Sequence, residues 1–445
     1  MNRSDSERIA TVLENIGYLP TSNQNEANLI VINMCSVRQS AVDRVYGKVQ
    51  KIQKLKTNRH TLKAILTGCI LKKDLEKFKN HFDYVLSVKS LKLWPEFLKE
   101  EKYFYYPNPR DPEFNEKSRI DYLKIKSKNL NNFSAFIPIS TGCNNFCSYC
   151  VVPSARGPEF SRPPEGIIQE VKNLVKGDCK EIWLLGQNVN SYGIQHETDA
   201  EQDTKLMRKI NFAGLLRMAN NVRGNFWIRF TSSHPKDFSD ELIETMAKCK
   251  KITPYLNLPV QSGDNKILKK MNRTYTVKHY KNLVKKIRNA FKKHRKDLEK
   301  NIFLSTDVIV GFPGEAKKQF ENTAKLFKEI KFDMAYISQY SPRPETTAAK
   351  MKDNVSKKEK TQREKILTEI LKKTAFQNSK KFIGKELEVL VEAEKRGYLR
   401  GKTRSYKTVK LKGSKNLIGN FVKVKIIDAI PWGLKGKLIK KTTAD

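Results

Sequence analysis

The sequence predicts an α/β protein in three parts, and three observations support this fold class. Over the first hundred residues, short apolar runs alternate with helical patterns, which indicates a parallel sheet. Six further apolar runs, again separated by helical patterns, indicate an incomplete β/α barrel. Residues 381–445 contain five short strand-like runs punctuated by glycine and proline, which is typical of a small closed β-barrel.

The N-terminal part contains three apolar runs, which we expect to be parallel strands at residues 29–32, 64–66 and 84–86. Cys35 and Cys69 each lie just past the end of a run. Because parallel strands present their carboxyl ends at one edge of a sheet, we expect these two cysteines to converge. The chain opens on a predicted helix with no strand before it, which indicates that an upstream strand is missing. Residues 103–121, rich in Pro, Asn and charge, are predicted to form a linker.

The central part contains the six runs that predict the barrel. A polar or glycine-rich loop follows each run, and in a β/α barrel these loops share the C-terminal face, where chemistry takes place. Gln187, Ser232, His234 and Gln261 lie in such loops. Six units instead of eight leave a cleft open on one side, which a bulky polymer could enter. The runs cover residues 136–139, 182–185, 227–230, 255–258, 304–309 and 334–337.

Three cysteines follow the first of these runs with the spacing C-x3-C-x2-C, namely Cys143, Cys147 and Cys150. Three thiolates on one short loop can hold three irons of a four-iron cluster and leave the fourth iron open for a small molecule. A structural zinc site would need a fourth ligand, and the nearest later candidates, Cys179 and His196, are unpaired. The spacing therefore predicts an iron–sulfur cluster and one-electron chemistry.

Charge is the second functional signal. The 445 residues include 86 Lys and Arg against 47 Asp and Glu, a net charge of +39, which favours a polyanionic partner such as nucleic acid. Abundant lysine throughout the chain is the alternative explanation. In the C-terminal barrel, Arg400, Lys402 and Arg404 alternate with tyrosines, a pattern that suits phosphates and bases. A protein-docking barrel is the alternative there.

The sequence contains no recognisable targeting signal. No apolar run approaches the length of a membrane span, and the first residues carry no apolar segment of the signal-peptide kind. We therefore expect a cytoplasmic protein without a membrane partner. Its seven cysteines then serve metals or chemistry rather than disulfides.

Several motifs carry a family resemblance that extends over essentially the whole chain. The loop at residues 142–150 resembles the radical S-adenosylmethionine (SAM) superfamily, and its continuation through Arg156 and Arg162 is similar to the methylthiotransferase family. Within that family, the sequence most resembles the branch that modifies isopentenyl-adenosine in tRNA. Further motifs of this resemblance lie at residues 184–192, 229–235, 258–263 and 307–315.

The resemblance implies four segments. They are a flavodoxin-like methylthiotransferase domain at residues 1–120, lacking its first strand, a radical-SAM core at 121–356, a helical connector at 357–380, and a TRAM domain at 381–443. It also implies two [4Fe-4S] clusters: one on Cys143, Cys147 and Cys150, which binds SAM, and a second on Cys35 and Cys69. The third ligand of the second cluster is absent from this chain. In the family it would lie two positions before Met1, so we expect a misplaced start codon.

The implied activity is methylthiolation of tRNA. A radical formed from SAM removes the hydrogen from C2 of N6-(dimethylallyl)adenosine at position 37 in the anticodon stem-loop, the second cluster delivers sulfur, and a second SAM supplies the methyl group. Close alternatives are a methylthiotransferase for N6-threonylcarbamoyladenosine in tRNA or for an aspartate of a ribosomal protein. A non-enzymatic alternative is an RNA-binding protein with a structural metal site. The enzyme would act as a monomer with an electron donor such as flavodoxin or ferredoxin and a sulfur donor.

The resemblance also implies roles for individual residues, each with a plainer alternative. Tyr149 would pack near the SAM adenine or serve as a core aromatic, and Gln187, Ser232 and Gln261 would contact polar groups of SAM or cap loops. His234 would face substrate or be a satisfied loop histidine. Arg156 and Arg162 would hold a SAM carboxylate or an RNA phosphate, or lie at the surface. Glu345 stands where the family usually has glycine.

Overall fold

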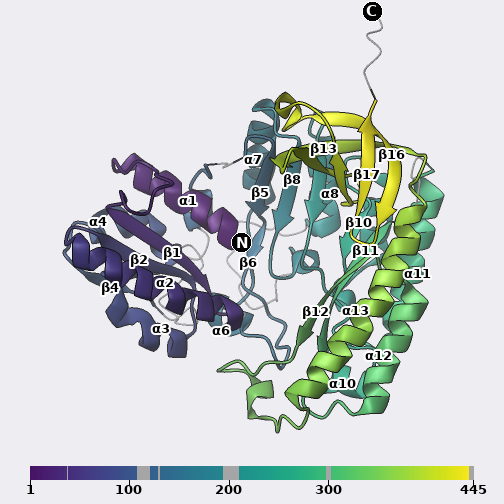
Figure 1. Ribbon diagram of the computed structural model, residues 1–445, viewed down its shortest axis with the longest axis horizontal. Helices are drawn as coiled ribbons and strands as arrows, with labels where there is room; N and C mark the ends of the chain where they lie inside the picture. Colours follow the sequence, from purple (N-terminus) through teal and green to yellow (C-terminus); the bar gives the residue numbers. More distant parts are fainter. Residues whose placement is uncertain (38, 108–120, 129–130, 194–209, 297–301, 440–445) are drawn as a thin grey trace, which may run out of the picture. The chain divides into compact units, whose positions relative to one another are not determined.

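The computed structural model describes residues 1–37, 39–107, 121–128, 131–193, 210–296 and 302–439. Two compact units make up the chain (Figure 1). The first unit comprises Met1–Leu130, Pro138–Arg162 and Ser341–Lys350, and the second comprises Asn131–Ile137, Pro163–Tyr340 and Met351–Asp445. The cysteine loop, which we expected within the core, thus clusters with the N-terminal sheet.

The first unit is built on a four-stranded parallel sheet in the order β1-β2-β3-β4. Its strands are β1 (Leu29–Cys35), β2 (Lys63–Cys69), β3 (Tyr84–Leu86) and β4 (Tyr103–Tyr105). The three predicted strands are present. Strand β4 corrects the linker prediction, because the triplet Tyr-Phe-Tyr pairs with β3 although proline and charged residues follow it. Most of the predicted linker, residues 108–120, lies outside the described residues.

Helices cover both faces of this sheet (Figure 1). Val42, Val45, Val49 and Ile52 recur at helical spacing along α2 and pack with α3 against one face. On the other face, Ile9 and Val12 of α1 join a second cluster that includes Trp94. The helices are α1 (Asn2–Asn15), α2 (Gln39–Asn58), α3 (Lys72–Phe78) and α4 (Trp94–Phe97). The cysteine loop lies between the short strand pair β6 (Ser140–Thr141) and β7 (Phe160–Ser161), and α6 (Val152–Arg156) follows it.

The second unit contains all six predicted core strands, arranged as two three-stranded sheets in the orders β5-β8-β9 and β10-β11-β12. A parallel bridge between Ile228 and Ile252 joins the end of one sheet to the start of the other. The strands are β5 (Ser134–Pro138), β8 (Glu181–Leu185), β9 (Trp227–Phe230), β10 (Tyr255–Asn257), β11 (Phe303–Val310) and β12 (Met334–Gln339). The helices are α7 (Pro164–Lys176), α8 (Phe212–Asn221), α9 (Asp240–Lys248), α10 (Asn265–Lys270), α11 (Val277–His294), α12 (Lys317–Ile330) and α13 (Lys357–Lys380).

The C-terminal strands close into a barrel in the order β13-β14-β15-β17-β16, as the sequence predicts (Figure 1). Alternating residues such as Val389, Val391, Leu399 and Val409 fill its interior. The strands are β13 (Glu386–Lys395), β14 (Tyr398–Thr403), β15 (Thr408–Leu411), β16 (Phe421–Ile430) and β17 (Gly433–Leu438). The last residues of the predicted TRAM domain, 440–443, lie outside the described residues. Among the residues described, none of the helices has the length and apolarity that crossing a membrane requires.

Candidate functional site

Cys35 and Cys69 lie directly opposite each other at the carboxyl ends of β1 and β2. Cys69 is buried and Cys35 is half-buried. Gly68, which precedes Cys69, has φ +116, and a Cβ atom there would lie 2.1 Å from the Met34 carbonyl oxygen. Only glycine therefore lets the two strand ends approach this closely. The convergence expected from the parallel sheet is present in the structure.

Arg156 contacts this cysteine pair. Its Nε donates a hydrogen bond to Sγ of Cys69 at 2.7 Å, and its Nη2 forms an ion pair with Oδ2 of Asp5 at 2.7 Å. Nη1 lies 3.3 Å from the hydroxyl of Tyr122. The side chain is only 4% exposed. The guanidinium of Arg156 is thus occupied by buried partners of the first unit, and its contact with a SAM carboxylate or an RNA phosphate stays a prediction.

The surroundings of Cys69 favour the neutral thiol. Burial raises the pKa of Cys69, and the nearby Arg156 charge opposes that rise. Asn2 contributes a further contact, since its Oδ1 lies 3.6 Å from the Cys69 sulfur. The α-amino group of Met1 is also enclosed here, and burial lowers its pKa. The edge of the sheet around Cys35 and Cys69 is therefore desolvated, and the charged groups next to it are those of Arg156 and Asp5.

Arg343, which is distant in the sequence, contacts the same edge of the sheet as Arg156. It donates to the backbone oxygen of Ser36, the residue after Cys35, and it lies 3.3 Å from Asp74. The side chain is buried. Two residues on, Glu345 has φ +65, a left-handed conformation that costs an L-residue about 1 kcal/mol. This backbone explains why glycine is the more usual residue at that position.

The C-x3-C-x2-C loop begins at a glycine that the backbone requires. Gly142 has φ +79, and a Cβ there would lie 1.9 Å from the carbonyl oxygen of Pro158. The amide of Cys143 donates to the Gly157 oxygen at 3.2 Å, and the amide of Cys150 donates to the Cys147 oxygen at 3.0 Å. Cys143 and Cys147 are buried, whereas Cys150 is half-buried. Backbone hydrogen bonds within this segment thus hold the loop in its conformation.

These residues fit an iron–sulfur cluster by the chemistry of their donors. All seven cysteines are free thiols, and three of them share this loop. Within the described part of the chain, no three Cys, His, Asp or Glu side chains are gathered at metal-binding distance, so the three sulfurs are not preassembled. Burial raises the pKa of Cys143 to about 11, which means that metal loading must displace its proton. Cys35 and Cys69 supply two donors, fewer than a cluster requires.

The candidate zinc ligands do not join this loop. Cys179 belongs to the second unit and is buried. Its thiol donates a hydrogen bond to the backbone oxygen of Glu181 at 3.3 Å. It is an ordinary buried thiol. His196 lies outside the described residues. Tyr149, which precedes Cys150, is half-buried.

In the second unit, the predicted SAM-contacting residues follow the strands of the core. Ser232 and Gln261 both have φ +66, an uncommon conformation for residues other than glycine that clusters at functional sites. Gln187 has a buried Oε1 atom without a hydrogen-bond partner. The amide of Val189 donates a hydrogen bond to the Ser232 backbone oxygen at 3.2 Å, which joins the loop after β8 to the loop after β9. Sequence reasoning missed the buried unpaired oxygens of two neighbouring residues, Asn188 and Ser233.

His234 makes hydrogen bonds within its loop, and whether it also faces substrate stays a prediction. Its Nδ1 accepts a hydrogen bond from the Lys236 amide at 3.2 Å, and its backbone exchanges two hydrogen bonds with the side chain of Asn190. Burial, followed by the charges of Arg273 and Lys236, lowers its pKa to about 2. His234 is therefore a neutral, buried histidine that fixes its loop.

Arg162 is likewise held by contacts within its own unit. It is buried, and its Nη1 donates to the Pro138 oxygen at 2.6 Å. Its backbone amide donates to the Ile139 oxygen at 2.8 Å. The side chain therefore binds the strand end before the cysteine loop, and its contact with a phosphate or carboxylate stays a prediction.

The basic residues of the C-terminal barrel divide into exposed and packed ones. Arg400 is exposed. Lys402 donates to Thr408 at 2.8 Å and lies over the Tyr406 ring, and burial lowers its pKa. Arg404 donates to the backbone oxygen of Lys250 in the core. Lys402 and Arg404 are therefore half-buried and partly held by contacts within the unit, and their contact with RNA stays a prediction.

Arg229 anchors the closed barrel to the core, a role that sequence reasoning missed. It forms a fully buried ion pair with Glu181 at 2.5 Å. It also donates to the backbone oxygens of Thr403 and Arg404, at 2.9 and 2.7 Å. The ring centroids of Tyr406 and Tyr255 lie 4.7 Å apart, with the two rings tilted at 42°. The turn between β14 and β15 therefore packs against the starting ends of the core strands.

Comparisons with known proteins agree with this three-part architecture. Residues 1–89 match the uncharacterized protein family UPF0004, residues 137–327 match the radical SAM superfamily, and residues 375–439 match the TRAM domain. A tRNA-2-methylthio-N(6)-dimethylallyladenosine synthase of Clostridium novyi (strain NT) is 41% identical over 99% of this chain and 94% of its own. The chain belongs to this synthase family. A family member from Alkaliphilus oremlandii (strain OhILAs) is 38% identical over 99% of this chain and 91% of its own.

Solved structures support the fold at lower similarity. The radical S-adenosylmethionine methyltransferase TsrM of Kitasatospora setae, solved with cobalamin and a [4Fe-4S] cluster, aligns with a TM-score of 0.52. The alignment covers 78% of this chain and 73% of TsrM at 13% identity. At that identity, the similarity between this chain and TsrM concerns their fold and not their chemistry.

Proposed function

We propose that this protein is a radical-SAM tRNA methylthiotransferase. It inserts sulfur and a methyl group at C2 of N6-(dimethylallyl)adenosine next to the anticodon, giving the 2-methylthio derivative. The observation that carries this proposal is the 41% identity, over 99% of this chain, to a relative that is named for this reaction. The placement of both cysteine sets in one compact unit supports it.

Cys143, Cys147 and Cys150 would hold the [4Fe-4S] cluster that binds SAM, and Cys35 and Cys69 would supply two of the ligands of the second [4Fe-4S] cluster. When bound, these groups supply the one-electron chemistry and the sulfur that side chains cannot. Gly142 gives the first loop its closed backbone. Arg156 keeps the Cys69 sulfur in a fixed, desolvated setting through its hydrogen bond.

SAM would be bound by Tyr149, Gln187, Ser232 and Gln261. Ser232 and Gln261 are supported by their left-handed backbone, and Gln187 is supported by its unpaired buried oxygen. A ligand with amino, carboxylate and ribose groups could satisfy such an oxygen, since leaving it unpaired costs about 1–3 kcal/mol. This cost is a reason to expect a polar ligand at the strand ends.

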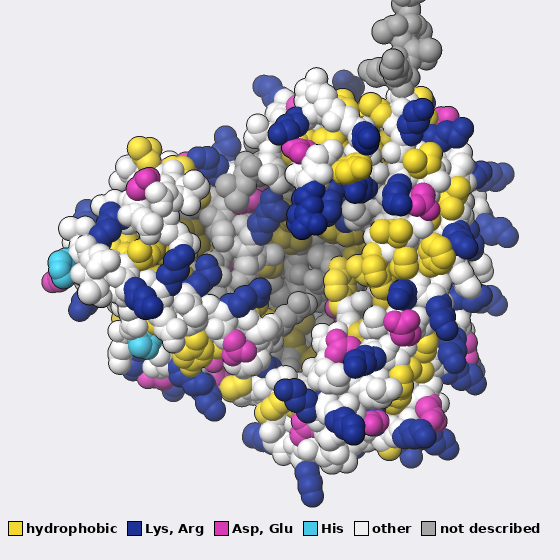
Figure 2. All heavy atoms as spheres, viewed as in Figure 1, with side chains coloured by type: hydrophobic (Ala, Val, Ile, Leu, Met, Phe, Trp, Pro, Cys, Tyr) yellow, Lys and Arg dark blue, Asp and Glu magenta, His cyan; other side chains and the backbone are white. Residues whose placement is uncertain are grey.

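The macromolecular substrate would be tRNA, held at its anticodon stem-loop. Arg400 is the predicted contact that remains exposed, and Lys and Arg side chains are spread over the visible face of both units (Figure 2). The enzyme would work in the cytoplasm as a monomer. An electron donor such as flavodoxin or ferredoxin and a separate sulfur donor would complete the reaction.

Mass spectrometry of tRNA nucleosides from a strain that lacks the gene tests the substrate. The proposal predicts that 2-methylthio-N6-dimethylallyladenosine disappears while its dimethylallyl precursor accumulates. Loss of the methylthio group from threonylcarbamoyl-adenosine, with the dimethylallyl nucleoside intact, would assign the protein to the sister branch. Unchanged tRNA nucleosides would contradict both assignments.

A further inference from the structure

A cavity of about 140 Å³ lies between the core sheet and the closed barrel of the second unit. Five strands (β10, β11, β12, β14 and β15) and three connecting segments contribute to it, and its walls are mainly aromatic. The aromatic residues that line it are Tyr255, Phe303, Tyr336, Tyr406 and Trp432. No residue in this group has a part in the cysteine sites or among the candidate SAM contacts described above.

The cavity opens on the inner face of the sheet β10-β11-β12. Tyr336 of β12 is in register with Asp307 of β11, and Asp307 lies on the same face as Phe303 because strand side chains alternate. Residues of the opposite face, such as Leu304 and Val308, are buried. Helices α12 and α13 run along that outer side of the sheet (Figure 1).

The cavity lies at the starting ends of the strands, away from the candidate SAM contacts. Tyr255 and Phe303 are the first residues of β10 and β11. Gln261, by contrast, bridges to Val308 near the far end of β11. A strand of eight residues such as β11 spans roughly 23 Å. A group bound in the cavity is therefore distinct from a base that reacts at the strand ends.

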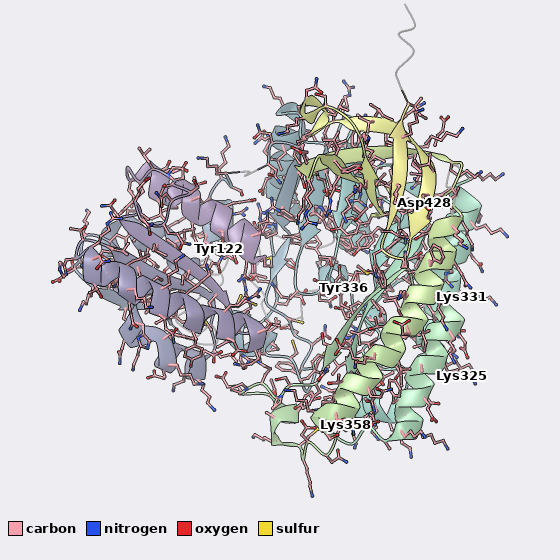
Figure 3. All side chains as sticks on the ribbon, in the orientation of Figure 1. Tyr122, Lys325, Lys331, Tyr336, Lys358 and Asp428 are labelled. Carbon is pink, nitrogen blue, oxygen red and sulfur yellow. The ribbon has the colours of Figure 1, made fainter. Side chains whose placement is uncertain are left out.

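Two of the lining rings are only half covered by protein. Tyr336 is 44% exposed and Trp432 is 43% exposed, although both contribute to the same cavity. Hydrophobic side chains are visible in this region below the closed barrel in Figure 2, and Figure 3 labels Tyr336 on β12. Tyr255 and Tyr406, whose tilted rings lie in contact with each other, form another part of the wall. The cavity thus leaves space for one flat ring beside these two half-exposed rings.

Lysines give this aromatic cavity a cationic border. Lys402 and Lys407 both line it, and each is held in place, by Thr408 at 2.8 Å and by Ser379 at 2.8 Å. Asp333 is the acidic residue among the lining residues. Aromatic faces beside fixed positive charge are the combination that single-stranded nucleic acid binds. The chain's net charge of +39 favours RNA over an aromatic side chain of a protein partner.

We propose that this cavity receives one unpaired base of the tRNA substrate, other than the adenine that is modified, which stacks against Trp432 and Tyr336. The inference rests on the proposed function, because it takes tRNA as the substrate. It adds a second base-binding position that would orient the anticodon loop relative to the reacting adenine.

Binding of an unmodified anticodon stem-loop transcript to the purified full-length chain tests this proposal. Trp432→Ala and Tyr336→Ala should each weaken binding about 5- to 100-fold, the range that loss of one base–aromatic stack gives. Trp432→Phe should bind nearly as well as the wild type. The salt dependence of binding should keep its slope in both alanine variants, because stacking releases no counterions.

Ile427→Ala is the matched control. Ile427 lies on β16, is 58% exposed and does not line the cavity, so its loss should leave RNA binding unchanged. Melting temperatures of all variants should match the wild type. Since Tyr336 and Trp432 lie on separate elements, a folding defect in one variant leaves the other as the test.

The outcomes separate the two proposals. Failure of the wild-type chain to bind the transcript would count against the proposed function itself. Wild-type binding together with undiminished binding by both alanine variants would overturn the base-binding cavity alone. An equal loss in Ile427→Ala, or a flattened salt slope in Trp432→Ala, would also overturn it, because the rings would then act through the general surface or through phosphate contacts.

Discussion

The Nε atom of Arg156 donates a hydrogen bond of 2.7 Å to the sulfur of Cys69. Arg156 follows Cys150 by six positions, so the segment that carries the C-x3-C-x2-C loop also reaches the thiols of the N-terminal sheet. The ion pair of Arg156 with the fully buried Asp5 fixes this contact. The segment that follows the C-x3-C-x2-C loop therefore contacts a cysteine of the other candidate cluster site, within one compact unit.

Arg156→Gln should destabilise the first unit by about 3–5 kcal/mol, because it leaves the Asp5 carboxylate buried without its partner. Denaturant unfolding measures this loss. The double variant Asp5→Asn with Arg156→Gln should lose less than the sum of the two single variants. Lys79→Gln is the control, since the exposed pair of Lys79 with Glu76 should contribute less than about 1 kcal/mol. Equal losses in Arg156→Gln and Lys79→Gln would contradict the buried pairing.

Gly142→Ala should lower the iron content of the reconstituted protein, because the added Cβ would collide with the Pro158 oxygen and distort the cysteine loop. Iron analysis after anaerobic reconstitution measures this. Gly166→Ala is the control: Gly166 lies within α7, and a Cβ there meets nothing within 4 Å. Its iron content should equal that of the wild type. Normal iron loading in Gly142→Ala would show that the loop does not depend on this backbone.

The second unit should lose stability below about pH 6.5 because of His234. Its pKa is lowered from 6.5 to about 2 in the folded chain, so the unfolded chain takes up the proton first and stability falls as the pH falls. Between pH 6.5 and 5.5 the expected loss is about 1 kcal/mol. His234→Asn, whose amide oxygen can replace Nδ1 as acceptor for Lys236, should lose less over this range.

Melting temperatures at the two pH values, followed by tryptophan fluorescence, measure the effect of His234. The exposed His60 provides the control, and His60→Asn should show the same pH dependence as the wild type. A pH dependence in His234→Asn that equals that of the wild type would contradict the assignment of a buried neutral histidine.

The strands could be predicted from the sequence because each is a short apolar run with a polar loop behind it. The convergence of Cys35 and Cys69 followed from the geometry of parallel strands alone. Strand β4 was missed because its three aromatic residues are followed by a stretch that resembles a linker.

The roles of the charged residues could not be predicted in the same way. A local pattern does not show whether an arginine meets solvent or a buried partner from a distant segment. Arg156 and Cys69 are 87 positions apart, and Arg229 and Thr403 are 174 apart. The left-handed backbone of Ser232 and Gln261 could not be predicted either, because neither serine nor glutamine is typical of that conformation.

Anaerobic reconstitution with iron and sulfide, followed by reduction in the presence of SAM, tests the central claim most directly. We predict that the wild-type chain binds iron well above trace levels and forms 5′-deoxyadenosine. Cys147→Ala should lose this product, whereas Cys179→Ala, which removes an ordinary buried thiol of the second unit, should keep it. Only trace iron and no 5′-deoxyadenosine from the wild type, or full product formation by Cys147→Ala, would contradict the account.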